Sequence, residues 1–174
     1  LIDEGNKVWK QVISSGKKYG FRNAQVTVLA PTGTIGFMMD VDCTGIEPMV
    51  ALSSSKGLAG GGKLLMSYKP CVKIGLQALG YNGEKLENIL KHIDNNGSVI
   101  NAPGLLKEHY NVFATALGDN IVSVDGHLKM MAAVQPFLSG AISKTVNLPK
   151  GATIQDVKDT YVKGWQMGLK SISL

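Results

Sequence analysis

Hydrophobic residues recur along this chain with two different spacings. Up to Gly20 they repeat at helical intervals, which predicts an amphipathic helix over about Ile2–Tyr19. Val26 and Val28 instead alternate with polar residues, which indicates a strand that ends near Pro31. The two patterns take turns down the rest of the sequence, so we expect an α/β architecture with parallel pairing of the strands. Further helices are expected at 72–79, 84–93, 105–117, 127–137 and 154–167, and further strands at 46–52, 63–66, 121–124, 141–147 and 169–174.

Capping residues mark several of the expected helix ends. Pro70 suits a first helical turn, and Gly80 ends the same helix as a C-terminal stop. Asn82 is placed to cap the helix at 84–93, and Thr153 with Asp156 forms the T-x-x-D pattern of a capping box. These signals define the helix boundaries more tightly than periodicity alone.

The strand at 24–29 runs directly into a Pro-Thr-Gly-Thr turn. Pro31 ends the strand ladder, and Gly33 permits close backbone approach. If a helix begins here, the N–H groups of Gly33, Thr34 and Ile35 point outward, with the positive end of the helix dipole behind them. An oxyanion is their natural partner, and the hydroxyls of Thr32 and Thr34 add donors. The alternative is that one threonine simply caps the helix, since the turn matches neither standard nucleotide-binding fingerprint.

Composition narrows the class of protein. The chain has 174 residues, 44% of them hydrophobic, which suits one folded domain. The formal charge is +5, but the basic residues are scattered, so a nucleotide fits as well as a nucleic acid. The only cysteines, Cys43 and Cys71, match no metal-binding spacing, so we expect no metal site, no disulfide framework and a reducing cytoplasm. No apolar run or leader pattern indicates a membrane protein.

Several other residues have both a functional and a structural interpretation. His127 beside Asp125 resembles an acid/base pair, but a histidine at a helix start more often caps it or makes a polar contact. Trp9 and Trp165 lie on apolar helix faces and are interpreted as core, and Cys71 as a buried thiol. A further group is placed near a nucleotide or cofactor only as a hypothesis; it comprises Ser139, Ser143 and Lys144.

The segment from Gly126 to Pro149 resembles the corresponding stretch of the adenosylcobalamin-dependent (class II) ribonucleotide reductases. That family also carries, in the same order, L-A-P-T-G-T-I, T-G-I-E-P, a Gly-Gly-Gly connection, A-P-G-L, E-H-x-x-V-F and G-W-x-x-G-L-K. Together these motifs cover nearly the whole chain. Their positions here are Leu29–Ile35, Thr44–Pro48, Gly60–Gly62, Ala102–Leu105, Glu108–Phe113 and Gly164–Lys170.

The resemblance implies a fold, a reaction and a binding site. The expected fold is a partial ten-stranded α/β barrel of the ribonucleotide reductase type, with residues 1–174 as the C-terminal portion of the barrel. The implied reaction converts ribonucleoside di- or triphosphates to deoxyribonucleotides by radical chemistry that adenosylcobalamin initiates. The implied substrate phosphate-binding residues are Ala30, Pro31, Thr32, Gly33, Thr34 and Ile35.

The sequence also departs from the family's pattern. The N-x-C-x-E fingertip cysteine motif is absent from these residues, so no catalytic residue is assigned, and Cys43, in V-D-C-T, is not interpreted as catalytic. The C-terminal cysteine pair that receives electrons from a thioredoxin-like reductant is also absent. Both ends look cut, so we expect a fragment of a larger chain. Alone it is expected to be inactive, and to associate or stay partly unfolded without the rest of its barrel.

Three alternatives stay open at this point. A metal-dependent class I reductase resembles the motifs less closely and usually carries a paired tyrosine near the closing strand, whereas 169–174 contains none. A non-catalytic phosphate-binding domain would keep the turn without the reaction. A basic nucleic-acid-binding module would lose affinity steeply with salt, and it is not the expected partner class.

Overall fold

The structure is a computed structural model that describes residues 1–39, 41–57 and 63–174. The expected Gly60–Gly62 connection therefore lies outside the described residues. Helices dominate, and the two regular strands form one antiparallel pair. The helices are α1 (Ile2–Tyr19), α2 (Gly33–Met38), α3 (Pro70–Ala78), α4 (Gly83–Asn96), α5 (Val124–Val134) and α6 (Ile154–Gln166), with 3-10 helices η1 (Lys107–Phe113) and η2 (Gln135–Phe137). The strands are β1 (Ser53–Gly57) and β2 (Lys63–Tyr68).

Most predicted helices are confirmed to within about three residues, but the helix expected over 127–137 lies at Val124–Val134 and continues only as the 3-10 helix η2, which contains Pro136. Helix α1 has the predicted bounds, and its C-cap, Gly20, has a φ of 77°, a conformation that glycine adopts without steric cost. Pro70 lies in the first turn of α3, and Thr153 and Asp156 form the complete capping box that opens α6. Asn82 occupies the N-cap of α4, but its side chain makes no capping hydrogen bond.

The expected helix over 105–117 is wrong in type. The structure has only the 3-10 helix η1 there. The carbonyl of Tyr110 accepts a hydrogen bond of 2.7 Å from the Asn120 side chain, and the N–H of Ala114 donates to Asn111 three residues earlier. Because a long-range side chain occupies a carbonyl that an α-helix would use, the segment keeps the tighter geometry.

The expected strands at 24–29, 141–147 and 169–174 lie side by side in parallel, but they do not form regular strands. They meet at the single bridges Leu29–Ile142 and Thr145–Ser173. Part of the first segment's backbone is used elsewhere, since the N–H of Thr27 donates to Ser139 Oγ at 2.9 Å. The expected strand at 121–124 is likewise reduced to a bridge, and 46–52 is irregular. These bridges have the expected parallel direction, whereas the regular pair of the described residues, β1 with β2, is antiparallel. The strand expected at 63–66 is confirmed as β2, and β1 was not expected.

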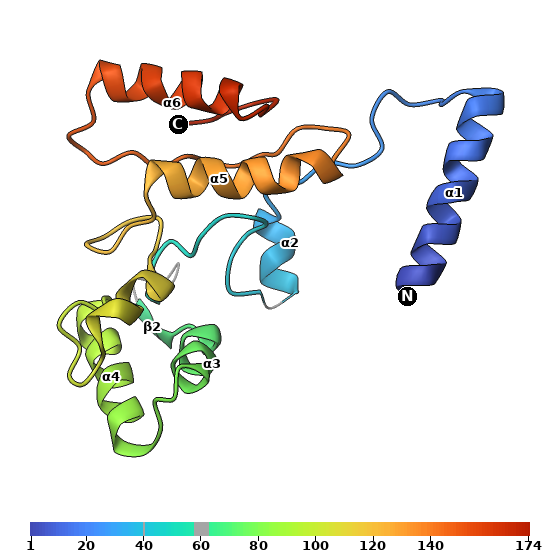
Figure 1. The fold of residues 1–174 in the computed structure, drawn as a ribbon. Coiled ribbons are helices and arrows are strands. Elements are labelled where there is room, and N and C mark those ends of the chain that lie inside the picture. Colours follow the sequence, from blue (N-terminus) through green and yellow to red (C-terminus); the bar gives the residue numbers. More distant parts are fainter. Residues whose placement is uncertain (40, 58–62) are drawn as a thin grey trace.

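Two hydrophobic clusters hold the described part of the chain together. The first, here called the α3–α4 core, joins α3 and α4 with neighbouring segments and fills the lower part of Figure 1. Its buried members are Leu52, Val72, Leu76, Tyr81, Leu86, Ile89, Leu90, Ile93, Val99, Ala102, Leu105 and Phe113.

The second cluster, here called the α5 core, joins α5 with the 141–147 segment and with residues that follow α6. Helices α5 and α6 run one above the other in Figure 1. The α5 core is built on the buried residues Leu128, Met131, Ile142 and Val146. Side chains from distant parts of the sequence pack against them while staying partly exposed. These are Leu29, Ile46, Val124, Val134, Leu138, Leu169 and Ile172.

Helix α1 stands apart from both cores (Figure 1) and buries none of its residues. The interpretation of the two tryptophans as core is therefore wrong in this chain. Trp9 is 55% exposed and Trp165 on α6 is 77% exposed. Both carry an apolar face that the described residues leave uncovered. None of the helices described is long and apolar enough to cross a membrane.

Candidate functional site

The Pro-Thr-Gly-Thr turn leads into helix α2, as the sequence predicts. Thr32 is the N-cap, and its carbonyl accepts the first helical hydrogen bond from Gly36 at 3.0 Å. Within the described residues, the N–H groups of Gly33, Thr34 and Ile35 have no recorded acceptor, and all three residues are exposed. The side chain of the N-cap residue Thr32 makes no capping hydrogen bond, and Thr34 lies inside the helix. The turn thus presents three free backbone donors.

Thr32 has an unusual backbone conformation. Its φ of 49° and ψ of 37° place it in the left-handed region, where β-branched residues are rare. Such a conformation costs free energy and persists only where surrounding structure holds it. One neighbour is Gly45, at which an added Cβ would lie 2.8 Å from the carbonyl oxygen of Ala30 and 3.6 Å from Thr32 Oγ1. The Thr44–Pro48 segment therefore lies directly against the turn, and only glycine allows that approach.

A cavity of about 230 Å³ opens beside the turn. Gly33 of the predicted phosphate-binding residues lines it, and the other five do not. Lys69 contributes a positive charge to its wall, and Thr44 a hydroxyl. The remaining lining residues are Gly36, Val41, Asp42, Cys43, Pro48, Met49, Val50 and Ala51.

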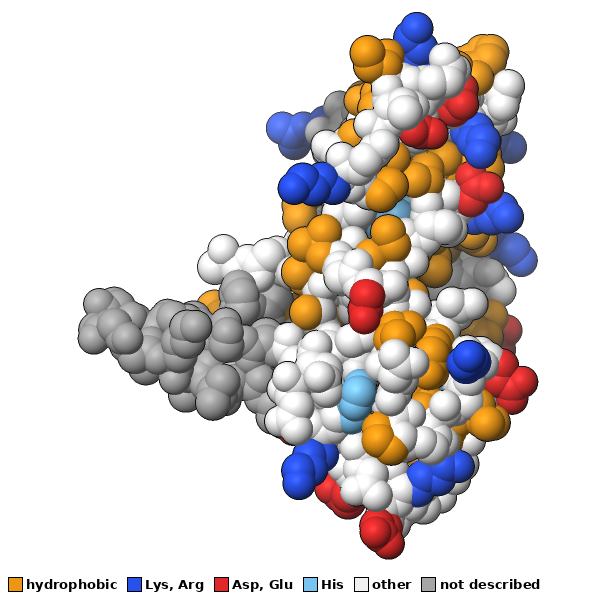
Figure 2. Space-filling model, turned by 90° about the vertical axis from the view of Figure 1, so that its left-hand side faces the viewer, with side chains coloured by type: hydrophobic (Ala, Val, Ile, Leu, Met, Phe, Trp, Pro, Cys, Tyr) orange, Lys and Arg blue, Asp and Glu red, His pale blue; other side chains and the backbone are white. Residues whose placement is uncertain are grey.

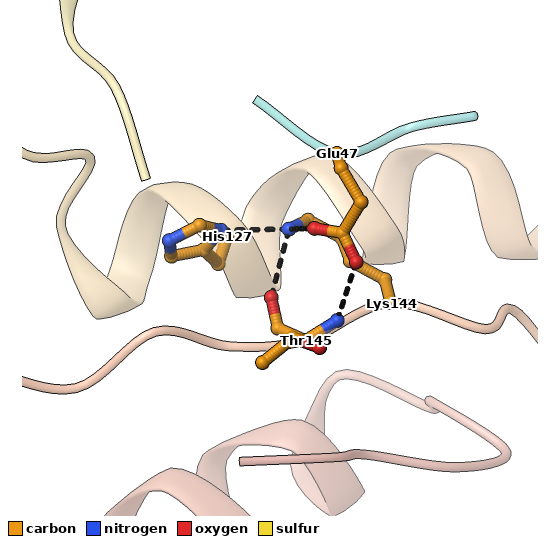
Figure 3. Close-up of polar contacts among 4 residues, drawn as sticks. All are labelled: Glu47, His127, Lys144 and Thr145. Carbon is orange, nitrogen blue, oxygen red and sulfur yellow. Dashed lines mark hydrogen bonds and ion pairs between the residues drawn. The ribbon is translucent and has the colours of Figure 1, made fainter. Parts of the chain in front are cut away.

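A buried polar network joins Glu47, His127, Lys144 and Thr145 (Figure 3). The Lys144 ammonium donates to Glu47 Oε2 at 2.8 Å, to His127 Nδ1 at 2.8 Å and to the carbonyl of Thr145 at 2.9 Å. The other oxygen of Glu47 accepts the Thr145 N–H at 2.7 Å. The Lys144 side chain is 1% exposed and that of Glu47 21%. The network joins the Thr44–Pro48 segment, α5 and the 141–147 segment.

The network also sets the protonation of His127. Burial lowers the pKa of this histidine, the Lys144 charge lowers it further, and Glu47 opposes them in part. His127 is therefore neutral at pH 7. Because Nδ1 accepts from Lys144, the ring proton is on Nε2, which is buried and has no partner among the described residues.

Asp125 and Ser139 have structural partners and do not form an acid/base pair with His127. Asp125 pairs with Lys163 at 3.0 Å and not with His127. Ser139 holds the backbone of Thr27, as described above.

The two cysteines show no sign of activation. Cys43 is exposed, and Cys71 is only half buried. Burial raises the pKa of the Cys71 thiol to about 11, together with a hydrogen bond that the thiol donates to the Asp42 carboxylate and the negative charges of Asp42 and Cys43. Cys71 is therefore a protonated thiol at pH 7, and its Sγ lies 3.5 Å from Met49 Sδ.

Sequence reasoning named the T-G-I-E-P motif but missed the role of its acidic residue. Glu47 is the only charged position between Thr44 and Val50. An acidic side chain inside an apolar segment needs a partner when it is buried, so this isolation was the available signal. Nothing local in the sequence pointed to Lys144, which is 97 positions away.

Comparison with known proteins defines the class. The family model for the ribonucleotide reductase barrel domain matches residues 3–174. The chain belongs to that family, and it is a portion of the barrel domain.

The similar proteins of known name point to one branch of the family. The chain is 52% identical to a vitamin B12-dependent ribonucleotide reductase of Rhodopirellula baltica, over all of this chain and 17% of that protein. It is 50% identical to one of Streptantibioticus cattleyicolor, over 97% of this chain and 28% of that protein. The chain thus spans less than a third of the length of these relatives, and the predicted resemblance to cobalamin-dependent reductases is confirmed.

A solved structure supports the fold. The class Id ribonucleotide reductase alpha subunit of Actinobacillus ureae superposes with a TM-score of 0.64. The match covers 91% of this chain and 27% of that one, at 23% sequence identity. At that identity the likeness shows the fold of the domain alone.

Proposed function

We propose that this chain is the C-terminal portion of the ten-stranded catalytic barrel of a cobalamin-dependent ribonucleotide reductase. The complete enzyme converts ribonucleoside di- or triphosphates to deoxyribonucleotides. Residues Ala30–Ile35 hold the substrate phosphates. The relatives support the reaction, and the free backbone donors of Gly33, Thr34 and Ile35 support the site.

The main support for phosphate binding is the set of free N–H groups where the turn opens helix α2. Three consecutive N–H groups at the start of a helix face outward, and the helix dipole adds partial positive charge behind them. Gly33 leaves the approach open, since an added Cβ there would meet no atom within 4 Å. The hydroxyl of Thr34 adds a donor that rotates toward a phosphate oxygen. Ala30 and Pro31 shape the entry to the turn.

Adenosylcobalamin supplies the radical when it is bound to the complete enzyme. His127, a buried histidine, is engaged with Lys144. This chain's own part in the reaction is to bind and orient the substrate. A thioredoxin-like reductant and the rest of the barrel are the other proposed partners, in a cytoplasmic enzyme. A nucleic-acid-binding role has less support, since basic, acidic and apolar side chains are interspersed on the face in Figure 2.

The test removes one donor from the turn in the full-length enzyme. A charge-assisted hydrogen bond contributes about 1.5–3 kcal/mol, so Thr34→Ala should weaken nucleotide binding about ten-fold or more. Binding of the matching nucleoside, which lacks the phosphates, should not change. Isothermal titration with both ligands measures the two affinities.

Thr153→Ala is the matched control, because it makes the same change at the start of α6, away from the turn. Equal nucleotide affinities for the wild type and Thr34→Ala, with the fold intact, would exclude the Thr34 hydroxyl from the phosphate site.

A further inference from the structure

We propose that Glu47, Lys144 and His127 are positioning residues that hold the phosphate-binding turn in its binding conformation. The inference rests on the proposed function of that turn. None of the three side chains reaches the turn itself. They act through two backbone connections: one reaches Ala30 and Thr32 through Gly45, and the other reaches Leu29, the residue before the turn.

All hydrogen-bond donors of the Lys144 ammonium are used. Its ammonium group has three protons, and each has an acceptor within 2.9 Å. With a side chain that is 1% exposed, it has no water to replace a lost partner. The position of its ammonium is thus fixed by Glu47, His127 and the Thr145 carbonyl together (Figure 3). Such a group transmits a displacement of one partner to the others.

Glu47 is connected to the phosphate-binding turn through the backbone of residues 44–47. The N–H of Glu47 donates to the carbonyl of Thr44 at 3.0 Å, which closes a tight four-residue turn. Gly45 lies within that turn, and a Cβ added to it would lie 2.8 Å from the Ala30 carbonyl oxygen and 3.6 Å from Thr32 Oγ1. The hydrogen bonds of the Glu47 carboxylate to Lys144 and to the Thr145 N–H therefore hold Gly45 beside the backbone of the phosphate-binding turn.

Lys144 is also connected to the residue that enters the turn. Ser143, the preceding residue, donates its N–H to the carbonyl of Leu29 at 3.0 Å. Leu29 packs on the α5 core and directly precedes Ala30. Lys144 thus directly follows Ser143, whose N–H is bonded to Leu29 at the entry to the turn. Through Glu47 it also anchors the Thr44–Pro48 segment, which lies against Thr32. This double connection explains how a β-branched residue is held in the left-handed region.

The experiment compares lysine variants in the full-length reductase. Lys144→Met keeps the length of the side chain but leaves the Glu47 carboxylate without its ammonium partner. Lys163→Met makes the same change on an ion pair that is half exposed, with α5 Asp125 as the partner, and serves as the control. Two quantities are measured: hydrogen exchange of peptides covering 29–39 and 44–49, and the affinities for a nucleoside diphosphate and for the phosphate-free nucleoside.

For Lys144→Met we expect exchange in both peptides to rise about ten-fold, which corresponds to about 1.4 kcal/mol of lost local stability. Diphosphate affinity should fall by a similar factor, while nucleoside affinity and the exchange of α4 stay as in the wild type. Lys163→Met should change none of these. If Lys144→Met destabilises the whole protein, Glu47→Gln provides the second variant, because it keeps the shape and the acceptor for the Thr145 N–H.

The double variant Glu47→Gln with Lys144→Met separates positioning from the cost of an unpaired buried carboxylate. It carries no unpaired carboxylate but also lacks the Glu47–Lys144 anchor, so exchange of both peptides should stay raised, and a return to the wild-type rate would overturn positioning. Positioning is overturned if Lys144→Met leaves exchange of 29–39 unchanged, or if exchange rises equally throughout α5 and α4. If exchange rises while neither Lys144→Met nor Thr34→Ala changes diphosphate affinity, the positioning stands and the proposed phosphate site fails.

Discussion

The two cores of this chain are built in different ways. The α3–α4 core takes all its buried residues from one continuous stretch, between Leu52 and Phe113. The α5 core draws on segments as distant as Leu29 and Ile172, and its fully buried members are few. It also contains buried polar side chains, among them His127, Gln135 and Lys144.

The two kinds of core suit different roles: a core of local contacts supports stability, and a core of distant segments builds a site. A core made of local contacts closes short loops, so its elements support one another without the rest of the protein. A core assembled from distant segments brings several backbone turns to one place, and charged groups buried there must be paired. The candidate phosphate-binding turn belongs to the second kind of core.

The largest expected effect comes from opening the α3–α4 core. Ile89 is fully buried on α4, and truncation of such a side chain leaves a cavity that the neighbours fill only in part. Ile89→Ala should therefore reduce the free energy of local unfolding of α4 by about 2–5 kcal/mol. Hydrogen exchange of the α4 amides in the full-length protein measures this value.

Ile74→Ala, at a site on α3 that is 65% exposed, is the control and should change the same free energy by less than about 0.5 kcal/mol. Exchange at 29–39, in the turn, should stay unchanged in both variants. If Ile89→Ala accelerated exchange in the turn as strongly as in α4, the two cores would form one cooperative unit and the comparison would not hold.

The sequence predicted the α3–α4 region well because its signals are local. Pro70, Gly80 and the apolar face of the helix at 84–93 determine where helices start, stop and bury themselves, whatever the rest of the chain does. It predicted the strand segments at 24–29 and 141–147 only in part. Regular strands need neighbours along their length, and here the two segments meet at one bridge.

The candidate site also has features that the local sequence predicts and features that depend on distant contacts. The start of α2 after Thr32 followed from the local pattern of Pro31 and Gly33. The left-handed conformation of Thr32 did not, since a β-branched residue with a positive φ runs against local preference. The pairing of Glu47 with Lys144 joins positions 97 apart and has no periodic signal at all. Burial and partners of charged residues are properties of the tertiary structure, not of spacing.

A smaller effect is expected from the titration of His127. Its pKa in the folded state lies below the ordinary 6.5, chiefly because of burial and then because of the Lys144 charge. As pH falls below about 6.5, the unfolded chain takes up a proton on this histidine before the folded chain does, so stability decreases. Above that pH the contribution is constant. Opening free energies of the α5 amides between pH 8 and pH 5 follow this change.

His127→Asn separates this histidine from other titrating groups. The Asn amide oxygen takes approximately the place of Nδ1 as acceptor for Lys144 but does not titrate. The variant should thus show a flatter decrease below pH 6.5 than the wild type. An identical slope in both proteins would mean that His127 is not the group that takes up the proton.

The smallest effect is expected at the start of α6, where the α5 core is covered by a helix with an exposed outer face. Thr153 Oγ1 accepts the N–H of Asp156 at 3.2 Å, and the Asp156 carboxylate accepts the Thr153 N–H at 2.7 Å. Thr153→Ala removes one side of this capping box and should cost about 1 kcal/mol, while Thr153→Ser should cost less because it keeps the hydroxyl. Hydrogen exchange over 153–160 compares the two variants. The first turn of α6 should open more readily in Thr153→Ala, whereas the α4 amides should exchange as in the wild type. Since Thr160 is the buried residue of α6 nearest this cap, unchanged exchange would mean that packing beneath the helix, and not the cap, determines its start.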